Sequence, residues 1–266
     1  MKVILSIATT TVGEAIRRKV LLVILLCGVL FLSVAPMLGS LTVRQETSNL
    51  KGLMLAIIKL TGALIALVLT IYIIPNEIER RTIYTILSKP VQRWQFILGK
   101  YLGAVLSIGL MMLLMTVVLI LSFHLVQNGL TLHFDLQTMG EISKGPLAFF
   151  LQASLLAAVA IFFSTFVSPT LNFFLAGGTY FVGIFLSSIY DSFASGPSQG
   201  AMKALAQVMY TVLPNFSFYD IQNPIVNPGQ QIQNEQMHFV LITLYFILYA
   251  GILLVGSVLI FDRREL

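Results

Sequence analysis

The stretch PNEIERRTIYTILSKPVQRWQFILGK, residues 75–100, lies between two long apolar runs and holds most of the charged residues in the first half of the chain that are not at the N-terminus. Its charged residues are Glu77, Glu79, Arg80, Arg81, Lys89, Arg93 and Lys100. The apolar residues between the two charged groups are Ile83, Ile86 and Leu87, at the spacing of one helical face. Thr82 is a suitable N-cap for such a helix, and Pro90 disfavours helix at the residue before it. The stretch predicts a short amphipathic helix, held between two membrane spans, that contacts a partner in the cytoplasm.

The composition is that of an integral membrane protein. Of 266 residues, 57% are hydrophobic and 10% are charged, and the mean hydropathy is +0.91, whereas about a quarter of the residues in a soluble domain are charged. The net charge of +5 does not indicate a nucleic-acid partner, because the basic residues cluster beside apolar runs rather than along a groove. The single cysteine, Cys27, excludes an internal disulfide. Residues 1–266 are predicted to form one membrane domain.

Six apolar runs are long enough to cross a bilayer, which requires ~20 residues. The predicted spans cover residues 20–39, 53–74, 96–126, 147–167, 171–190 and 238–261. The fold class is therefore an all-α membrane protein with six transmembrane helices. Residues 1–19 carry apolar and charged faces at helical spacing, which predicts an amphipathic helix on the cytoplasmic membrane surface.

The segment before the sixth span has two interpretations. Residues 201–210 are apolar but too short to span, and residues 212–220 are aromatic and broken by proline. A re-entrant or surface-lying hairpin that closes the outer end of a pathway fits this pattern. An ordinary loop with an interfacial aromatic belt fits it equally.

The distribution of Lys and Arg predicts the orientation. With both termini in the cytoplasm, 11 of the 16 basic residues lie inside. The five on the outer side are Arg44, Lys51, Lys59, Lys144 and Lys203. By the positive-inside rule the chain is a multi-pass protein of the cell (inner) membrane with both termini cytoplasmic.

Few residues of the spans are suited to chemistry. The chain lacks the glycine-rich loop and Gly-Lys-Ser/Thr motif that binds nucleotide phosphates. The three histidines, His124, His133 and His238, lack the spacing of metal ligands on one helix, so no metal site is predicted. Lys59, within the second span, either reaches the outer interface along its aliphatic stem or faces a polar translocation path.

Gly99 and Gly103 place two small residues one helical turn apart at the start of the third span. This spacing permits close helix packing in lipid, although it is frequent by chance.

Four short segments together resemble a known family. They are residues 77–93 (Glu-x-Glu-Arg-Arg-Thr-Ile-Tyr-Thr-Ile-Leu-Ser-Lys-Pro-Val-Gln-Arg), residues 98–103 (LGKYLG), residues 163–166 (FSTF) and residues 213–215 (LPN). With these segments the chain resembles the ABC-2 type transporter permeases, and within them the NosY-like branch associated with maturation of multicopper enzymes. Arg81 stands where that family commonly has glycine, which leaves the local turn open.

The resemblance implies a type V exporter-like half-transporter. A separate ABC ATPase subunit would bind ATP and Mg, so no cofactor and no enzymatic activity are expected in this chain. The other implied partners are a second copy of the chain, membrane lipid and an extracytoplasmic protein. The implied ATPase-coupling region comprises Glu77, Glu79, Arg80, Arg81, Thr82, Ile83, Ile86, Leu87, Lys89, Pro90 and Arg93. The implied outer gate comprises Pro214, Asn215 and Phe216.

Two other functions stay open from the residues: an intramembrane enzyme, and a stand-alone membrane scaffold or channel. The near absence of carboxylates and histidines inside the spans argues against the enzyme. The transported substrate, its direction, and the choice between solute export and mechanical work on an outer partner are open.

Overall fold

A computed structural model describes residues 2–39, 46–79, 92–128, 136–195, 201–221 and 234–262, and these residues contain helices but no strand. The elements are α1 (Lys2–Arg17), α2 (Lys19–Gly39), α3 (Glu46–Ile71), α4 (Ile73–Glu79), α6 (Arg93–Asn128), α7 (Leu136–Ser164), α8 (Pro169–Ser195), α9 (Ala201–Val212), the 3₁₀ helix η1 (Phe216–Tyr219) and α11 (Glu235–Asp262). Six of them, α2, α3, α6, α7, α8 and α11, are long and apolar enough to cross a membrane. The prediction of an all-α membrane protein with six spans is confirmed.

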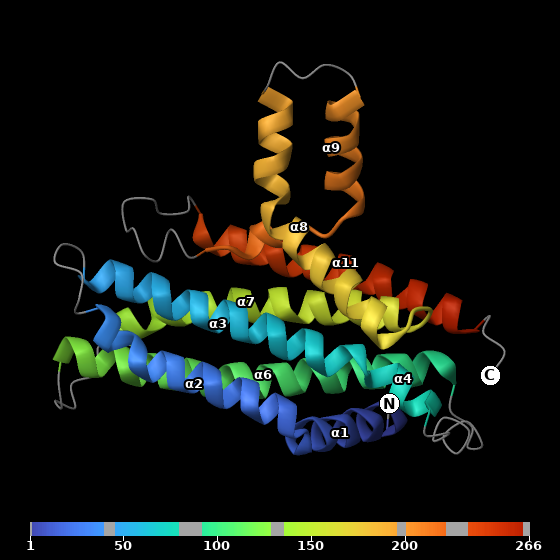
Figure 1. Ribbon diagram of the computed structural model, residues 1–266, viewed down its shortest axis with the longest axis horizontal. Coiled ribbons are helices and arrows are strands. Elements are labelled where there is room, and N and C mark those ends of the chain that lie inside the picture. Colours follow the sequence, from blue (N-terminus) through green and yellow to red (C-terminus); the bar gives the residue numbers. More distant parts are fainter. Residues whose placement is uncertain are drawn as a thin grey trace.

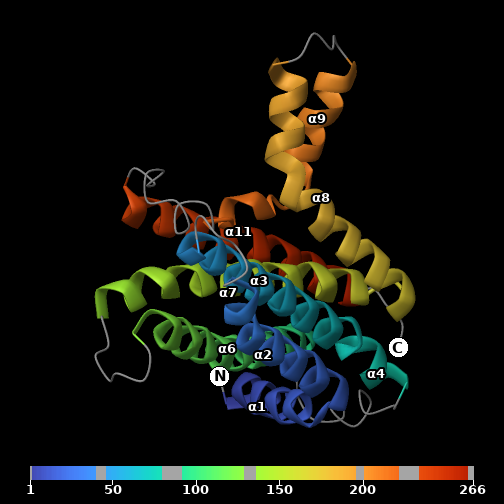
Figure 2. The same ribbon diagram turned by 60° about the vertical axis from the view of Figure 1, so that its left-hand side comes forward.

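The helices α3 and α7 form the centre of the bundle, with α2, α6 and α11 alongside them (Figures 1 and 2). In the most apolar part of α3 and α7, 67% and 72% of the residues are buried, against 17% in both α8 and α11. The sequence explains the central place of α7, because residues 153–161 are small or aliphatic on every side of the helix and all are buried. A helix that is apolar all round is suited to a core.

The N-terminal helix α1 packs along the first turns of α6. Its buried face consists of Ala8, Thr11 and Ala15, which recur at helical spacing. Gly99 and Gly103 of α6 face this side: a Cβ atom on Gly99 would lie 2.8 Å from the Ile7 Cβ, and one on Gly103 would lie 2.6 Å from the Thr11 Cβ. The backbones of α1 and α6 therefore approach at a distance that only glycine permits on the α6 side.

The second half of α8 and the whole of α9 form a helical hairpin that stands away from the bundle (Figures 1 and 2). This hairpin includes the apolar stretch at 201–210, and α8 continues to Ser195, beyond the expected end of span five at residue 190. Large apolar side chains on it are exposed, among them Leu205 at 62% and Val208 at 58%. Within one chain the hairpin does not lie over the ends of the other spans.

The helix α7 begins at Leu136, well before the expected start of span four at residue 147. Gly145 and Pro146 disfavour helix, but their neighbours Ile142 and Ala148 are buried in the core. Tertiary packing here overrides a local propensity that costs a few kcal/mol.

Candidate functional site

Three charged side chains from different helices meet beside the start of α6, and we call Glu14, Glu77 and Lys100 the charge cluster. The Lys100 Nζ atom donates to Glu77 Oε1 at 2.5 Å and lies 3.7 Å from Glu14 Oε2. The Lys100 and Glu77 side chains are only 4% and 12% exposed, whereas Glu14 is 52% exposed. The cluster ties α1, α4 and α6 together at one end of the bundle.

Arg93 makes a second attachment at this end. Its Nη1 atom donates to the carbonyl oxygens of Phe261 at 2.9 Å and Asp262 at 3.0 Å, and its Nε lies 3.7 Å from Asp262 Oδ1. The last carbonyl groups of a helix have no partner within it, so a guanidinium here satisfies them and complements the negative end of the helix dipole. The stacked rings of Phe96 and Phe261 extend the contact between α6 and α11.

The expected coupling region is described at its two edges. Glu77 and Arg93 lie in α4 and at the start of α6, with the contacts given above, and Glu79 ends α4. The residues between them, Arg80, Arg81, Thr82, Ile83, Ile86, Leu87, Lys89 and Pro90, lie outside the described residues, and so does the expected helix at 83–87. What the structure shows is that both chain ends of this stretch are fixed to the bundle.

A second polar site lies where the chain returns from the hairpin, and we call residues 212–220 the η1 junction. Asn215 is its centre: its Oδ1 accepts from the Ser217 backbone N–H at 3.0 Å, and its Nδ2 donates to Ser187 Oγ at 3.0 Å. The Asn215 backbone N–H donates to the Tyr245 hydroxyl at 2.9 Å. Gln152 Nε2 of α7 donates to the Phe216 carbonyl at 3.1 Å. One short segment is thus bonded to α7, α8 and α11.

The fit of the η1 junction against α8 is close. Pro214, Asn215 and Phe216 are all buried. A Cβ atom on Gly183 would lie 2.5 Å from both the Pro214 carbonyl oxygen and a ring carbon of Phe216. No side chain fits at position 183 unless the junction moves.

Lys59 has a partner in the η1 junction. Its Nζ atom donates to Asp220 Oδ2 at 2.7 Å, with the side chains 14% and 38% exposed, and lies 5.8 Å from the centre of the Phe149 ring. Lys59 is nine residues beyond Leu50, where the apolar span begins, which is about 14 Å along the helix. The junction therefore reaches a charge inside the spanning part of α3, an arrangement that neither interpretation of Lys59 included.

Tyr219 closes the η1 junction on the side of α11. Its hydroxyl donates to the Ile242 carbonyl at 3.3 Å, and burial raises the pKa of the phenol well above its ordinary value of about 10. The phenol is therefore a neutral hydrogen-bond donor across the physiological pH range.

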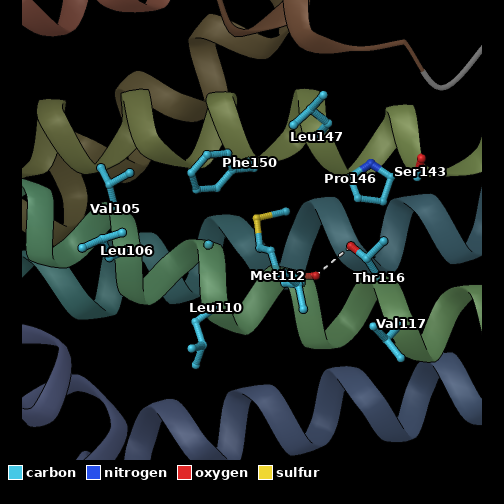
Figure 3. A pocket seen from close by; sticks show the side chains of 12 residues that line it. Val105, Leu106, Leu110, Met112, Thr116, Val117, Ser143, Pro146, Leu147 and Phe150 are labelled. Carbon is cyan, nitrogen blue, oxygen red and sulfur yellow. Dashed lines mark hydrogen bonds between the residues drawn. The ribbon is translucent and has the colours of Figure 1, made fainter. Parts of the chain in front are cut away.

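A groove of about 460 Å³ between α6 and α7 has a different character (Figure 3). Apolar side chains such as Leu110, Met112 and Phe150 line most of it. The Thr116 hydroxyl is bonded to the Met112 carbonyl at 2.8 Å and the Ser143 hydroxyl to the Gly140 carbonyl at 2.8 Å. Because both hydroxyl protons are used within the helices, the groove suits an apolar chain and not a charged solute. Among the described residues, no three His, Cys, Asp or Glu side chains are placed to hold a metal ion.

The chain matches the profile of a known protein family. The profile of the ABC-2 family transporter proteins matches residues 5–266, nearly the whole chain. The chain belongs to the ABC-2 transporter family. A search of the curated proteins finds no match. Membership makes this multi-pass chain the membrane component of a transporter, a component that works in general with an ABC ATPase.

Several residues of this ABC-2 permease that make its polar contacts were not among the expected site residues. The sequence shows Lys100 only as a charge at the end of the stretch 75–100, and Glu14 only as one residue of the predicted amphipathic helix at 1–19. Gln152 and Asp220 are polar residues next to or within apolar surroundings, and such residues need a partner in lipid. That signal was present in the sequence, but it does not name the partner.

Proposed function

We propose that this ABC-2 permease is the membrane subunit of a type V exporter-like transporter, worked by a separate ATPase that acts on residues 80–91. The observation that carries the proposal is the attachment of both ends of this stretch. Glu77 holds one end to Lys100, and Arg93 holds the other to Phe261 and Asp262. A displacement of the stretch would be passed to α1, α6 and α11 together.

The charge cluster can transmit work only if the ATPase binds two conformations of the permease with unequal affinity. A contact of equal strength in both conformations shifts no equilibrium. Residues 75–100 carry acidic and basic groups before an apolar helix pattern and basic groups after it. Such a surface can form different ion pairs with an ATPase in its open and closed states. The orientation follows from the same reasoning: the end of the bundle with the charge cluster faces the cytoplasm of the cell membrane, and both termini lie there.

In the half of the bundle away from the charge cluster, Pro214, Asn215 and Phe216 act as the outer gate. The hydrogen bonds of Asn215 and Phe216 reach α7, α8 and α11, and Asp220 of the same η1 junction bonds to Lys59 of α3. Opening a path along α3 would separate Lys59 from Asp220 and expose both charges. Once separated within the membrane, the two charges require solvation by water or by a polar substrate. Opening of the path is therefore favoured when either is present.

The assembly is a homodimer of permeases with two ATPases. The exposed apolar side chains of the hairpin, such as Leu205 and Val208, suit a second copy. The NosY-like resemblance of residues 77–93 supports an outer protein, on which the complex would do mechanical work, as the alternative to a solute.

The test begins with the tagged full chain, expressed with its genomic neighbours and purified in mild detergent. We expect a stoichiometric ABC ATPase to co-purify and to hydrolyse ATP. A pure homo-oligomer without any ATPase would instead favour a stand-alone scaffold or channel. Catalysis by the isolated chain that depends on a histidine or on Glu77 would favour an intramembrane enzyme.

Coupling is measured on a cysteine introduced at Thr211, next to the η1 junction, with Cys27 replaced by serine. We expect trapping of the ATPase with ATP and vanadate to change the labelling rate of this cysteine. Arg93→Gln is expected to abolish that change while ATP hydrolysis continues, whereas Lys203→Gln, a remote basic residue on the exposed hairpin, leaves it intact. A normal response in Arg93→Gln would contradict the proposed role of this attachment.

A further inference from the structure

A hollow of about 700 Å³ lies between the first turns of α2, the end of α3 and the first turns of α8. Arg18 and Lys19, at the junction of α1 and α2, line it together with Tyr72 and Thr170, and we call the part lined by these four residues the rim. The walls are apolar and include Val68, Phe173 and Phe174, of which Phe174 is 67% exposed. The hollow is thus cationic at its rim and apolar at its base.

The rim is positive for two reasons. Within the part of the chain that the structure describes, no carboxylate pairs with Arg18 or Lys19, and no acidic residue lines the hollow. The start of α8, a helix of 27 residues beginning at Pro169, also opens on it. The N-terminal end of a helix carries a partial positive charge and free N–H groups. An anion is the species that this rim fits.

The position of the hollow decides the kind of anion. The apolar spans of α2 and α8 begin at Lys19 and Pro169, and the span formed by α3 and the start of α4 ends at Pro75. The rim therefore lies where three spans meet the water phase, at the level of lipid headgroups. A small soluble anion would make no contact with the apolar wall of Val68, Phe173 and Phe174. A neutral apolar ligand would supply no counter-charge to Arg18 and Lys19.

We propose that this hollow binds an anionic glycerophospholipid. The phosphate lies between Arg18, Lys19 and the first turn of α8, and one acyl chain runs along α3 between α2 and α8. Basic pockets between transmembrane helices on the cytoplasmic side recognise lipid headgroups in this way. The inference goes beyond the proposed transport function, and it names a lipid site with a defined headgroup class.

The experiment is native mass spectrometry of the full chain, delipidated in detergent and titrated with dioleoyl phosphatidylglycerol or with dioleoyl phosphatidylcholine. We expect one phosphatidylglycerol to be retained per chain in preference to phosphatidylcholine. Replacing both Arg18 and Lys19 by glutamine is expected to weaken its retention roughly 25-fold, about fivefold for each charge lost. The matched control is Arg17→Gln, an exposed neighbour that does not line the hollow and is expected to leave retention unchanged.

Four results would overturn the proposal. Two are retention of phosphatidylcholine equal to that of phosphatidylglycerol, and a loss of retention in Arg17→Gln equal to that in the double variant. The other two are displacement of the lipid by millimolar inorganic phosphate, and a second copy of the chain that covers the hollow in place of lipid. A photoactivatable phosphatidylglycerol provides a measurement without any variant. Label on residues 169–174 supports the site, and label confined to other surfaces contradicts it. None of these measurements needs ATP or an ATPase, so their failure leaves the proposed transport function standing.

Discussion

Replacement of Lys100 by methionine isolates the energetics of the charge cluster. Methionine keeps most of the apolar stem and removes only the ammonium group that contacts Glu77 and Glu14. The Glu77 carboxylate, in a side chain 12% exposed, then loses the ammonium group that lies 2.5 Å from it. The Glu14 side chain is 52% exposed, so water solvates its carboxylate without a counter-charge.

The size of the effect can be bounded from two sides. Removing one partner of a buried ion pair costs about 3–5 kcal/mol. A buried carboxylate that loses a counter-charge can instead take up a proton, which for an ordinary glutamate costs about 3.7 kcal/mol at pH 7 and about 1 kcal/mol at pH 5. We therefore expect Lys100→Met to lose about 3 kcal/mol at pH 7. The loss arises from an ionised carboxylate, so it is present at high pH and shrinks as the pH falls.

The assay is unfolding of the purified protein in mixed micelles of maltoside and dodecyl sulfate, followed by circular dichroism. The double variant with Glu77→Gln removes both charges and is expected to lie within about 1 kcal/mol of the wild type. Glu77→Gln by itself leaves Lys100 beside Glu14 and is expected to cost less than Lys100→Met. The reasoning fails if Lys100→Met costs under about 1 kcal/mol, or if the double variant is no more stable than the single one.

Three further predictions follow from close contacts and exposed surface. Gly183→Ala places a Cβ against the η1 junction and is expected to lower the free energy of unfolding by about 1–3 kcal/mol. The control Gly178→Ala, with open space around it, is expected to raise that free energy by up to about 1 kcal/mol through helix propensity. Equal effects of the two variants would contradict the close fit at Gly183. Gly103→Ala is expected to displace α1 from α6 and raise the protease sensitivity of α1, whereas Gly13→Ala, which also faces open space, leaves it unchanged. A cysteine at Leu205, with the natural cysteine removed, is expected to form a disulfide-linked dimer in membranes under mild oxidation, and monomer only would mean that lipid covers this face of the hairpin.

The spans could be predicted from the sequence because burial in protein and burial in lipid demand the same apolar side chains. For that reason the sequence could not show that α3 is central while much of α8 stands away from the bundle. A run such as 171–190 reads as a span whether its neighbours are helices or lipid. The start of α7 at Leu136 was missed because core packing of Ile142 outweighs local helix breakers.

The polar contacts were partly foreseeable. A charge within a span, such as Lys59, is costly without a partner, so the sequence indicates that one exists. Its partner Asp220 is 161 residues away, and no spacing rule relates residues at that distance. The residues expected at the outer gate were Pro214, Asn215 and Phe216, and the structure places all three in the η1 junction. Their role as a gate stays a prediction.

The helix α11 takes part in both polar sites, which bears on how movement at one end could reach the other. Near its end, the carbonyls of Phe261 and Asp262 accept from Arg93. Seventeen residues before Asp262, the hydroxyl of Tyr245 accepts from the Asn215 backbone, and this separation is about 25 Å along a helix. An uninterrupted helix of 28 residues keeps its length because its hydrogen bonds resist stretching. We therefore expect a displacement of Arg93 along the axis of α11 to reach Asn215 with little loss, and a sideways displacement to be lost where α11 has few packed neighbours.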